Sequence, residues 1–161
     1  MLDKYYYGEV TRISPEAPVP INHITRQKET LGGAANVAHN LALLGCDTIL
    51  AGFVGEDYHC RSLKEKLLEN KIDDVGLVPT NRPTTTKMRI IGGHQQMMRL
   101  DFESTEPLET IYIDKFLAFV RGKLAESIDA IVVSDYAKGT CSEATTTAII
   151  EAAHAHGVPV I

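Results

Sequence analysis

The residues best suited to chemistry in this sequence are a glycine pair, Gly32 and Gly33, followed by Asn36. Glycine has no Cβ, so the backbone there can take positive φ values and a ligand can approach it closely. A helix beginning after such a turn presents free backbone N–H groups, which suit oxygen-rich ligands. Asn36 either reaches that ligand or caps those donors. Without the dinucleotide fingerprint or the phosphate loop, the pattern also fits an ordinary helix start.

A second group of polar residues lies in two segments of alternating pattern. Thr84–Ile91 and Gln95–Phe102 flank Gly92-Gly93 and alternate with period two, which predicts a β-hairpin. Successive strand residues point to opposite faces, so one face gathers four charged side chains, Lys87, Arg89, Arg99 and Asp101. Three cations and one anion would attract a phosphate group. The alternative is a solvated face that carries an Arg–Asp pair.

A third group follows the apolar segment Asp129–Ser134, which we expect to be a buried strand. In a parallel sheet, functional side chains collect at the carboxyl ends of the strands. Asp135 and Lys138 are therefore candidates for substrate contact. Alternatively, Asp135 caps the turn before the next helix, although Ser142 is the more obvious N-cap of that helix.

These candidates need a scaffold, and the apolar patterns predict alternating helices and strands. We expect helices at 34–44, 57–70, 111–128 and 142–156, and strands at 48–55, at 129–134 and from 158 onward. The first helix carries a narrow face of small residues that can pack closely on a sheet: Ala34, Val37, Ala38, Leu41 and Ala42. This order is typical of an α/β fold with a mostly parallel sheet.

Two segments do not fit the alternating core. Residues 9–30 contain Pro15, Pro18 and Pro20, so they are predicted to form an extended arm with edge-strand pieces. Together with residues 84–103 they would make a small β lid. The core would then comprise residues 31–83 and 104–161 of a single domain.

The segment Gly32-Gly33-Ala34-Ala35-Asn36-Val37-Ala38 resembles the sugar-contacting glycine motif of the ribokinase-like (PfkB) carbohydrate kinases. Residues 12–20, 95–103 and 134–139 resemble the heptose 7-phosphate kinase branch, which supplies the kinase domain of bifunctional ADP-heptose synthases. The resemblance runs through residues 1–161 in order and covers roughly the first half of the family's kinase domain. It implies a partial ribokinase-like three-layer fold with a β lid.

The resemblance also implies the residues that bind a sugar phosphate. In the family a strand ends in a Met-Leu-Asp-like sequence whose Asp hydrogen-bonds sugar hydroxyls, and Asp3 occupies that position. We expect the preceding strand to be missing, and in that case Asp3 is instead a frayed terminal residue. The full set of expected substrate-binding residues is Asp3, Gly32, Gly33, Asn36, Lys87, Arg89, Arg99, Asp101, Asp135 and Lys138.

By the same resemblance, the activity would be ATP- and Mg²⁺-dependent phosphorylation of heptose 7-phosphate at O1, for ADP-heptose and lipopolysaccharide precursor biosynthesis. The family's catalytic Gly-Ala-Gly-Asp motif and its Asn-x-x-Glu motif do not occur in the 161 residues. We therefore expect this chain to be a sugar-phosphate-binding half that lacks the catalytic residues and the segment that binds ATP and Mg²⁺. As such it would have no kinase activity. We also expect both of its ends to be truncated. The alternative is a catalytically inactive sugar-phosphate-binding or dimerisation module, so enzyme status stays open.

The composition excludes several other classes. A net charge of −5 argues against a nucleic-acid or anionic-membrane surface, and no apolar run approaches the ~20 residues of a membrane span. Without a signal-peptide pattern, we expect a cytoplasmic protein. Three widely spaced cysteines and His154 with His156 match no metal motif. A dinucleotide oxidoreductase is excluded because its glycine fingerprint is missing.

The hairpin also predicts association. One of its faces carries five apolar side chains, Met88, Ile90, Met98, Leu100 and Phe102. Such a face would lower solubility unless something covered it. We expect the same lid of a second copy to cover it, which gives a two-fold homodimer.

Overall fold

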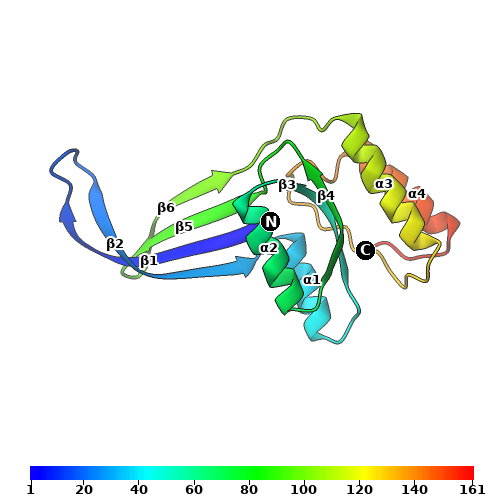
Figure 1. Cartoon of the computed structure of the whole chain (residues 1–161), viewed down its shortest axis with the longest axis horizontal. Helices are drawn as coiled ribbons and strands as arrows, with labels where there is room; N and C mark the ends of the chain where they lie inside the picture. The colour runs from blue at the N-terminus through cyan, green and yellow to red at the C-terminus, as the bar shows by residue number, and fades with distance from the viewer.

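The computed structural model describes all 161 residues, arranged as two sheets and four helices (Figure 1). The four-stranded sheet, called the lid sheet below, has the order β2-β1-β5-β6 and contains β1 (Leu2–Ile13), β2 (Pro20–Leu31), β5 (Thr86–Gly92) and β6 (Gln95–Phe102). The two-stranded sheet pairs β3 (Ile49–Gly55) with β4 (Asp73–Thr80) in parallel. The helices are α1 (Ala34–Leu43), α2 (Tyr58–Glu69), α3 (Thr110–Leu124) and α4 (Glu143–Ala155). In Figure 1 the lid sheet projects to the left, away from α3 and α4.

The lid sheet is larger than the predicted arm and hairpin. Strands β1 and β2 form a long antiparallel hairpin of 12 residues each, where edge-strand pieces were expected. The prolines do not break it, because Pro15 and Pro18 lie in the connection and Pro20 is the first residue of β2. The expectation that Met1-Leu2-Asp3 ends a strand is wrong, since β1 begins at Leu2.

The predicted hairpin of residues 84–103 is confirmed. Strands β5 and β6 are antiparallel, and Lys87 is paired with Asp101 and Arg89 with Arg99. Directly paired residues share one face of a sheet, so the four predicted charged side chains do lie on the same face. Strand β1 runs parallel to β5 and adds Asp3 beside Lys87 and Tyr5 beside Arg89.

The core lies between β3, α1 and α2. Its main cluster is made of nine buried residues: Leu31, Ala35, Ala38, Leu50, Val54, Cys60, Leu63, Leu67 and Ile72. The small residues Ala35 and Ala38 allow α1 to approach the sheet closely, as the predicted narrow face requires. A smaller cluster of Leu124, Ala153 and Val158 joins α3 to α4. The prediction of an α/β fold is confirmed.

Two predicted core strands are wrong. Residues 129–134 and the segment from Val158 form a single parallel bridge, between Ile131 and Val160, instead of strands. The backbone from Ile131 to Val133 bonds only to residues 159–161, and Val132 remains 41% exposed. An apolar run forms a stable strand when neighbours pair with it and cover its faces, and here one edge lacks a neighbour. Strand β4 was not predicted, because Gly76 and Pro79 disfavour strand.

A carboxylate fixes the lid sheet to the core where β5 begins. Asp57 accepts hydrogen bonds from the backbone N–H groups of Cys60 and Thr84, both at 2.8 Å, and so caps α2 while holding the approach to β5. The Thr84 hydroxyl in turn accepts from the N–H of Gly55, at the end of β3. Burial would raise the pKa of Asp57, but these hydrogen bonds outweigh it and keep that pKa below its ordinary value.

Candidate functional site

A polar cavity of about 640 Å³ lies where the lid sheet meets the start of α1. We call it the lid cavity. Six of the ten predicted site residues line it: Asp3, Gly32, Gly33, Asn36, Lys87 and Arg89. Residues from β1, β5 and the β2–α1 turn thus meet at one place, although they are separated by up to 86 positions in the chain.

The glycine pair is required by the geometry of this cavity. A Cβ on Gly32 would overlap the Asp3 carboxylate, and Gly33 has a φ of 52° and a ψ of −131°. Residues with a side chain rarely adopt that φ. Gly33 is itself the N-cap residue of α1, and no side chain caps the helix there. The amide of Asn36 therefore lines the cavity and does not serve as the N-cap.

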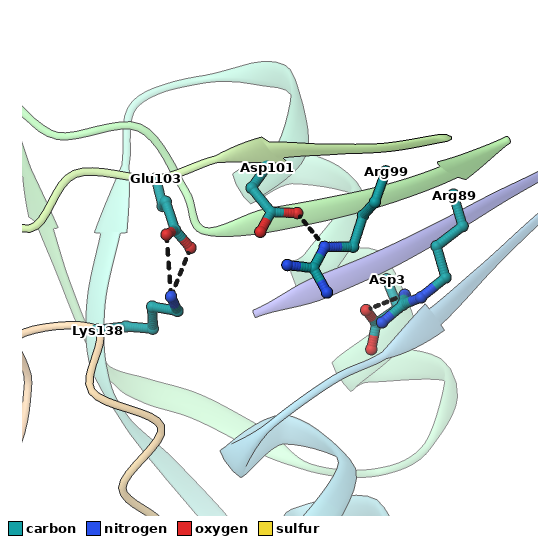
Figure 2. Close-up of polar contacts among 6 residues, drawn as sticks. All are labelled: Asp3, Arg89, Arg99, Asp101, Glu103 and Lys138. Carbon is teal, nitrogen blue, oxygen red and sulfur yellow. Dashed lines mark hydrogen bonds and ion pairs between the residues drawn. The ribbon is translucent and has the colours of Figure 1, made fainter. Parts of the chain in front are cut away.

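Ion pairs order the charged face of the lid sheet. Arg89 Nη1 lies 2.6 Å from Asp3 Oδ1, and Arg99 Nε lies 2.8 Å from Asp101 Oδ1 (Figure 2). The hydrogen bond to Asp3 raises the pKa of Arg89 above its ordinary value. Lys87 is placed beside Asp3 and Asp101 in the sheet but forms an ion pair with neither, whereas Arg89 and Arg99 do. Its ammonium group is therefore the cavity's free cation on the lid side.

The other four predicted residues lie outside the lid cavity. Arg99 and Asp101 are on the neighbouring strand β6, paired with Arg89 and Lys87, and lie on the same face of the lid sheet. Asp135 and Lys138 are in the loop that follows residues 129–134. Asp135 Oδ1 accepts from the N–H of Ala137 at 2.7 Å, and Lys138 Nζ lies 2.9 Å from each carboxylate oxygen of Glu103 (Figure 2).

Asp135 and Lys138 belong instead to a second cavity. It measures about 1100 Å³ and lies among β3, α1 and the segment around residues 128–135. Its lining is mainly apolar and includes Phe53, Phe116 and Val133. Tyr136 lines both cavities, as Met1 and Gly33 do, and so lies at their boundary.

Sequence reasoning missed two tyrosines that line the lid cavity, Tyr5 and Tyr136. Tyr5 could have been found, because it is two residues from Asp3 and so lies on the same face of β1. Its ring lies 5.2 Å from the Arg89 guanidinium and stacks on Tyr7. Tyr136 carried no such signal, since its segment does not form a regular strand.

The residues present do not make a magnesium site. No group of three or more His, Cys, Asp or Glu side chains is placed to hold a metal ion. The lid cavity is instead lined by three cationic side chains (Lys66, Lys87 and Arg89) and three carboxylates (Asp3, Glu29 and Glu69). Among these, Asp3 can accept from hydroxyls and the unpaired Lys87 can bind an anionic group, which suits a polyol that carries a phosphate. In addition, none of the helices has the length and apolar character needed to cross a membrane.

Solved structures with this arrangement define the class of fold. Phosphofructokinase-2 from Escherichia coli in complex with fructose-6-phosphate matches with a TM-score of 0.71 and 19% identity, covering 99% of this chain and 50% of that chain. Ribokinase from Arabidopsis thaliana complexed with ribose and ATP matches with a TM-score of 0.65 and 18% identity, covering 99% and 49%. The fold is therefore ribokinase-like, as predicted.

The family follows from the sequence. The family model described as "pfkB family carbohydrate kinase" matches residues 4–161, so the chain belongs to this family. It is 44% identical to D-beta-D-heptose 7-phosphate kinase of Bordetella bronchiseptica, covering all of this chain and 50% of that protein. It is also 44% identical to bifunctional protein HldE of Magnetococcus marinus, covering 34% of that protein. The chain thus spans between a third and half of these relatives' length, and the predicted resemblance is confirmed.

Proposed function

We propose that this chain is the sugar-phosphate-binding part of an ATP-dependent heptose 7-phosphate kinase that phosphorylates O1. The observation that carries the proposal is the lid cavity, where a free lysine, a carboxylate and a glycine turn converge. The name of the Bordetella bronchiseptica relative, D-beta-D-heptose 7-phosphate kinase, supports heptose 7-phosphate as the ligand. ADP-heptose biosynthesis is the pathway that we propose for it. The cytoplasm is the compartment that this role requires.

The two ends of the ligand would be held by different groups. Asp3 Oδ1 is engaged by Arg89, while Oδ2 lies beside Gly32 and can accept hydrogen bonds from sugar hydroxyls. The Asn36 amide can both donate to and accept from hydroxyls at the start of α1. Lys87 and Arg89 would bind the phosphate, with Arg99 and Asp101 continuing the charged face along β6. For Asp135 and Lys138 we keep contact with the substrate as a prediction.

The first prediction tests the phosphate end. Lys87→Met should weaken binding of heptose 7-phosphate about tenfold or more, because a charge-assisted hydrogen bond is lost, and should leave binding of the unphosphorylated heptose unchanged. Isothermal titration calorimetry with both sugars measures this. Lys115→Met, which changes an exposed lysine on α3, is the matched control. Equal affinity of the wild-type chain for the two sugars would contradict the proposal.

The alternative role as a dimerisation module rests on the other face of the lid sheet. Met88 is paired with Leu100 and Ile90 with Met98, so these side chains share the face opposite Lys87. Met98 is 56% and Leu100 39% exposed, which leaves an uncovered apolar surface. A second copy of the chain would cover that surface through its own lid sheet. Dimerisation and sugar-phosphate binding use opposite faces of the sheet and are compatible.

The second prediction concerns this apolar face. The wild-type chain should be a homodimer at micromolar concentration, and Met98→Glu should convert it to a monomer, because a charge would be buried in the interface. Multi-angle light scattering coupled to gel filtration measures the mass directly. The control is Glu143→Gln, at the first position of α4. A monomeric wild-type chain would overturn the dimer.

A further inference from the structure

Three residues line both cavities, namely Met1, Gly33 and Tyr136, and one of them contributes an aromatic ring to the boundary. Carbons Cδ2 and Cε2 of Tyr136 lie 3.5 and 3.6 Å from the position that a Cβ would take on Gly33. The ring is therefore next to the glycine turn at the start of α1. Tyr136 is 52% exposed, so packing in the core does not hold its side chain in place. The loop that carries Tyr136 therefore determines where the ring lies.

Tyr136 differs from the other aromatic residue of the lid cavity. The ring of Tyr5 is already engaged by the Arg89 guanidinium and by the ring of Tyr7. No aromatic or cationic contact involves Tyr136. Its ring is thus not engaged by another aromatic or cationic group, and it lines a cavity whose other walls are largely polar. Binding sites commonly combine such an aromatic surface with a few polar groups that fix the ligand's orientation.

The loop that carries Tyr136 is fixed on both sides of the ring. Asp135 accepts from the N–H of Ala137, which has a positive φ of 53°. Lys138 is held by both carboxylate oxygens of Glu103, directly after β6 (Figure 2). Glu103 has no other ion-pair partner. The ion pair therefore connects the end of the lid sheet to the residue two positions after Tyr136.

We propose that Tyr136 determines sugar specificity in the lid cavity and that the Glu103–Lys138 ion pair is the contact that positions its ring. This inference rests on the proposed function. A pyranose ring has C–H groups on its faces, and these pack against the face of an aromatic ring. With the hydroxyls held at Asp3 and Asn36, Tyr136 would contact the apolar face of the sugar and discriminate against sugars of another ring shape. In this proposal the Lys138 ammonium is engaged by Glu103 and acts through Tyr136, and this positioning role replaces the direct substrate contact predicted for it above.

The chain contains no tryptophan, so Tyr136→Trp introduces a single fluorophore at this position. Heptose 7-phosphate should shift its emission maximum, and inorganic phosphate at the same concentration should not. In calorimetry, Tyr136→Ala should weaken heptose 7-phosphate binding about tenfold, while Tyr112→Ala on α3 should leave it unchanged. Tyr136→Leu is the second variant, used with the alanine variant after circular dichroism has shown that both are folded.

The positioning role is tested in the Tyr136→Trp background. Lys138→Met should move the emission of the ligand-free chain to longer wavelength and weaken binding, and Lys138→Arg should restore both, because arginine can still pair with Glu103. Unchanged emission and affinity in Lys138→Met would overturn the positioning role. If the wild-type chain binds heptose 7-phosphate and both Tyr136→Ala and Tyr136→Leu bind it equally well, the specificity role is overturned while the proposed function stands. If the wild-type chain does not bind it, both fail.

Discussion

Replacing Glu29 by alanine is expected to lower the free energy of unfolding by about 3 kcal/mol, which is a large share of the stability of a domain. Lys4 is 5% exposed, and its ammonium lies 2.6 Å from Glu29 Oε1. The Ser62 hydroxyl donates to the other carboxylate oxygen and so joins α2 to the lid sheet. Without the carboxylate, a buried ammonium and a hydroxyl would both lose their acceptor. The value is at the lower end for broken buried pairs, because the Glu29 side chain keeps 22% exposure.

The same pair gives the stability a pH dependence. Burial would raise the pKa of Glu29, but hydrogen bonds from Lys4 and Ser62 outweigh it and hold that pKa below its ordinary value. A depressed carboxylate pKa stabilises the fold fully above the ordinary value of about 4.3, and the contribution disappears as the pH falls through the folded pKa. The wild-type chain should therefore lose stability below about pH 4, and Glu29→Ala should lack that part of the loss.

Urea unfolding followed by circular dichroism at pH 7 and pH 3 measures both effects. The matched control is the double variant Lys4→Met with Glu29→Leu, which removes the two charges together and replaces them with apolar groups. It should be markedly more stable than Glu29→Ala, because no uncompensated charge stays buried. A double variant as unstable as the single one would show that the loss comes from packing.

Gly32→Ala is expected to weaken binding of heptose 7-phosphate by about 10- to 100-fold, which corresponds to the loss of a charge-assisted hydrogen bond. The new Cβ would overlap the Asp3 carboxylate. Asp3 has a short side chain and is tied to Arg89 at 2.6 Å, so it cannot move aside without breaking that ion pair. The substitution therefore disturbs the hydroxyl-binding and phosphate-binding groups together.

Calorimetry with heptose 7-phosphate measures the loss, with thermal unfolding followed in parallel. Gly122→Ala is the matched control, because Gly122 lies inside α3 with open space at the Cβ position. It should leave binding unchanged and stabilise the fold by about 0.5–1 kcal/mol, as alanine favours helix. Undiminished binding by folded Gly32→Ala would contradict the placement of the sugar at Asp3.

The parts of the fold that sequence predicted are those where local pattern decides the structure. Ser142 was expected to cap α4, and its hydroxyl does accept from the N–H of Thr145. The alternation of residues 84–103 gave the hairpin and its charged face, because strand period and side-chain direction are locally determined. Strands β1 and β2 were underestimated, since Pro15 and Pro18 occupy the turn between them and Pro20 begins β2, so that no proline interrupts a strand.

The site was predicted only in part, because long-range contacts decide which groups are free. Alternation placed Lys87, Arg89 and Arg99 on one face but could not show that Asp3 pairs with Arg89 and leaves Lys87 unpaired. Nor could it show that Lys138 pairs with Glu103, since the two residues are separated by 35 positions. The contact that we propose to position Tyr136 is the same Glu103–Lys138 pair, so no local pattern indicated its place in the cavity.

The pairing of β1 with β5 has a consequence for how the chain folds. Leu2 is the partner of Thr86, and the lid sheet thus joins segments that are 84 residues apart, whereas β1 with β2 and β5 with β6 are hairpins of neighbouring strands. Closing so long a loop costs chain entropy before the contacts reward it, and such non-local pairing slows folding. During synthesis, the edge of β1 that pairs with β5 stays unpaired until β5 has been made. Lid cavity assembly should therefore be a late folding event, and the interval before it is when the nascent chain is most prone to aggregate.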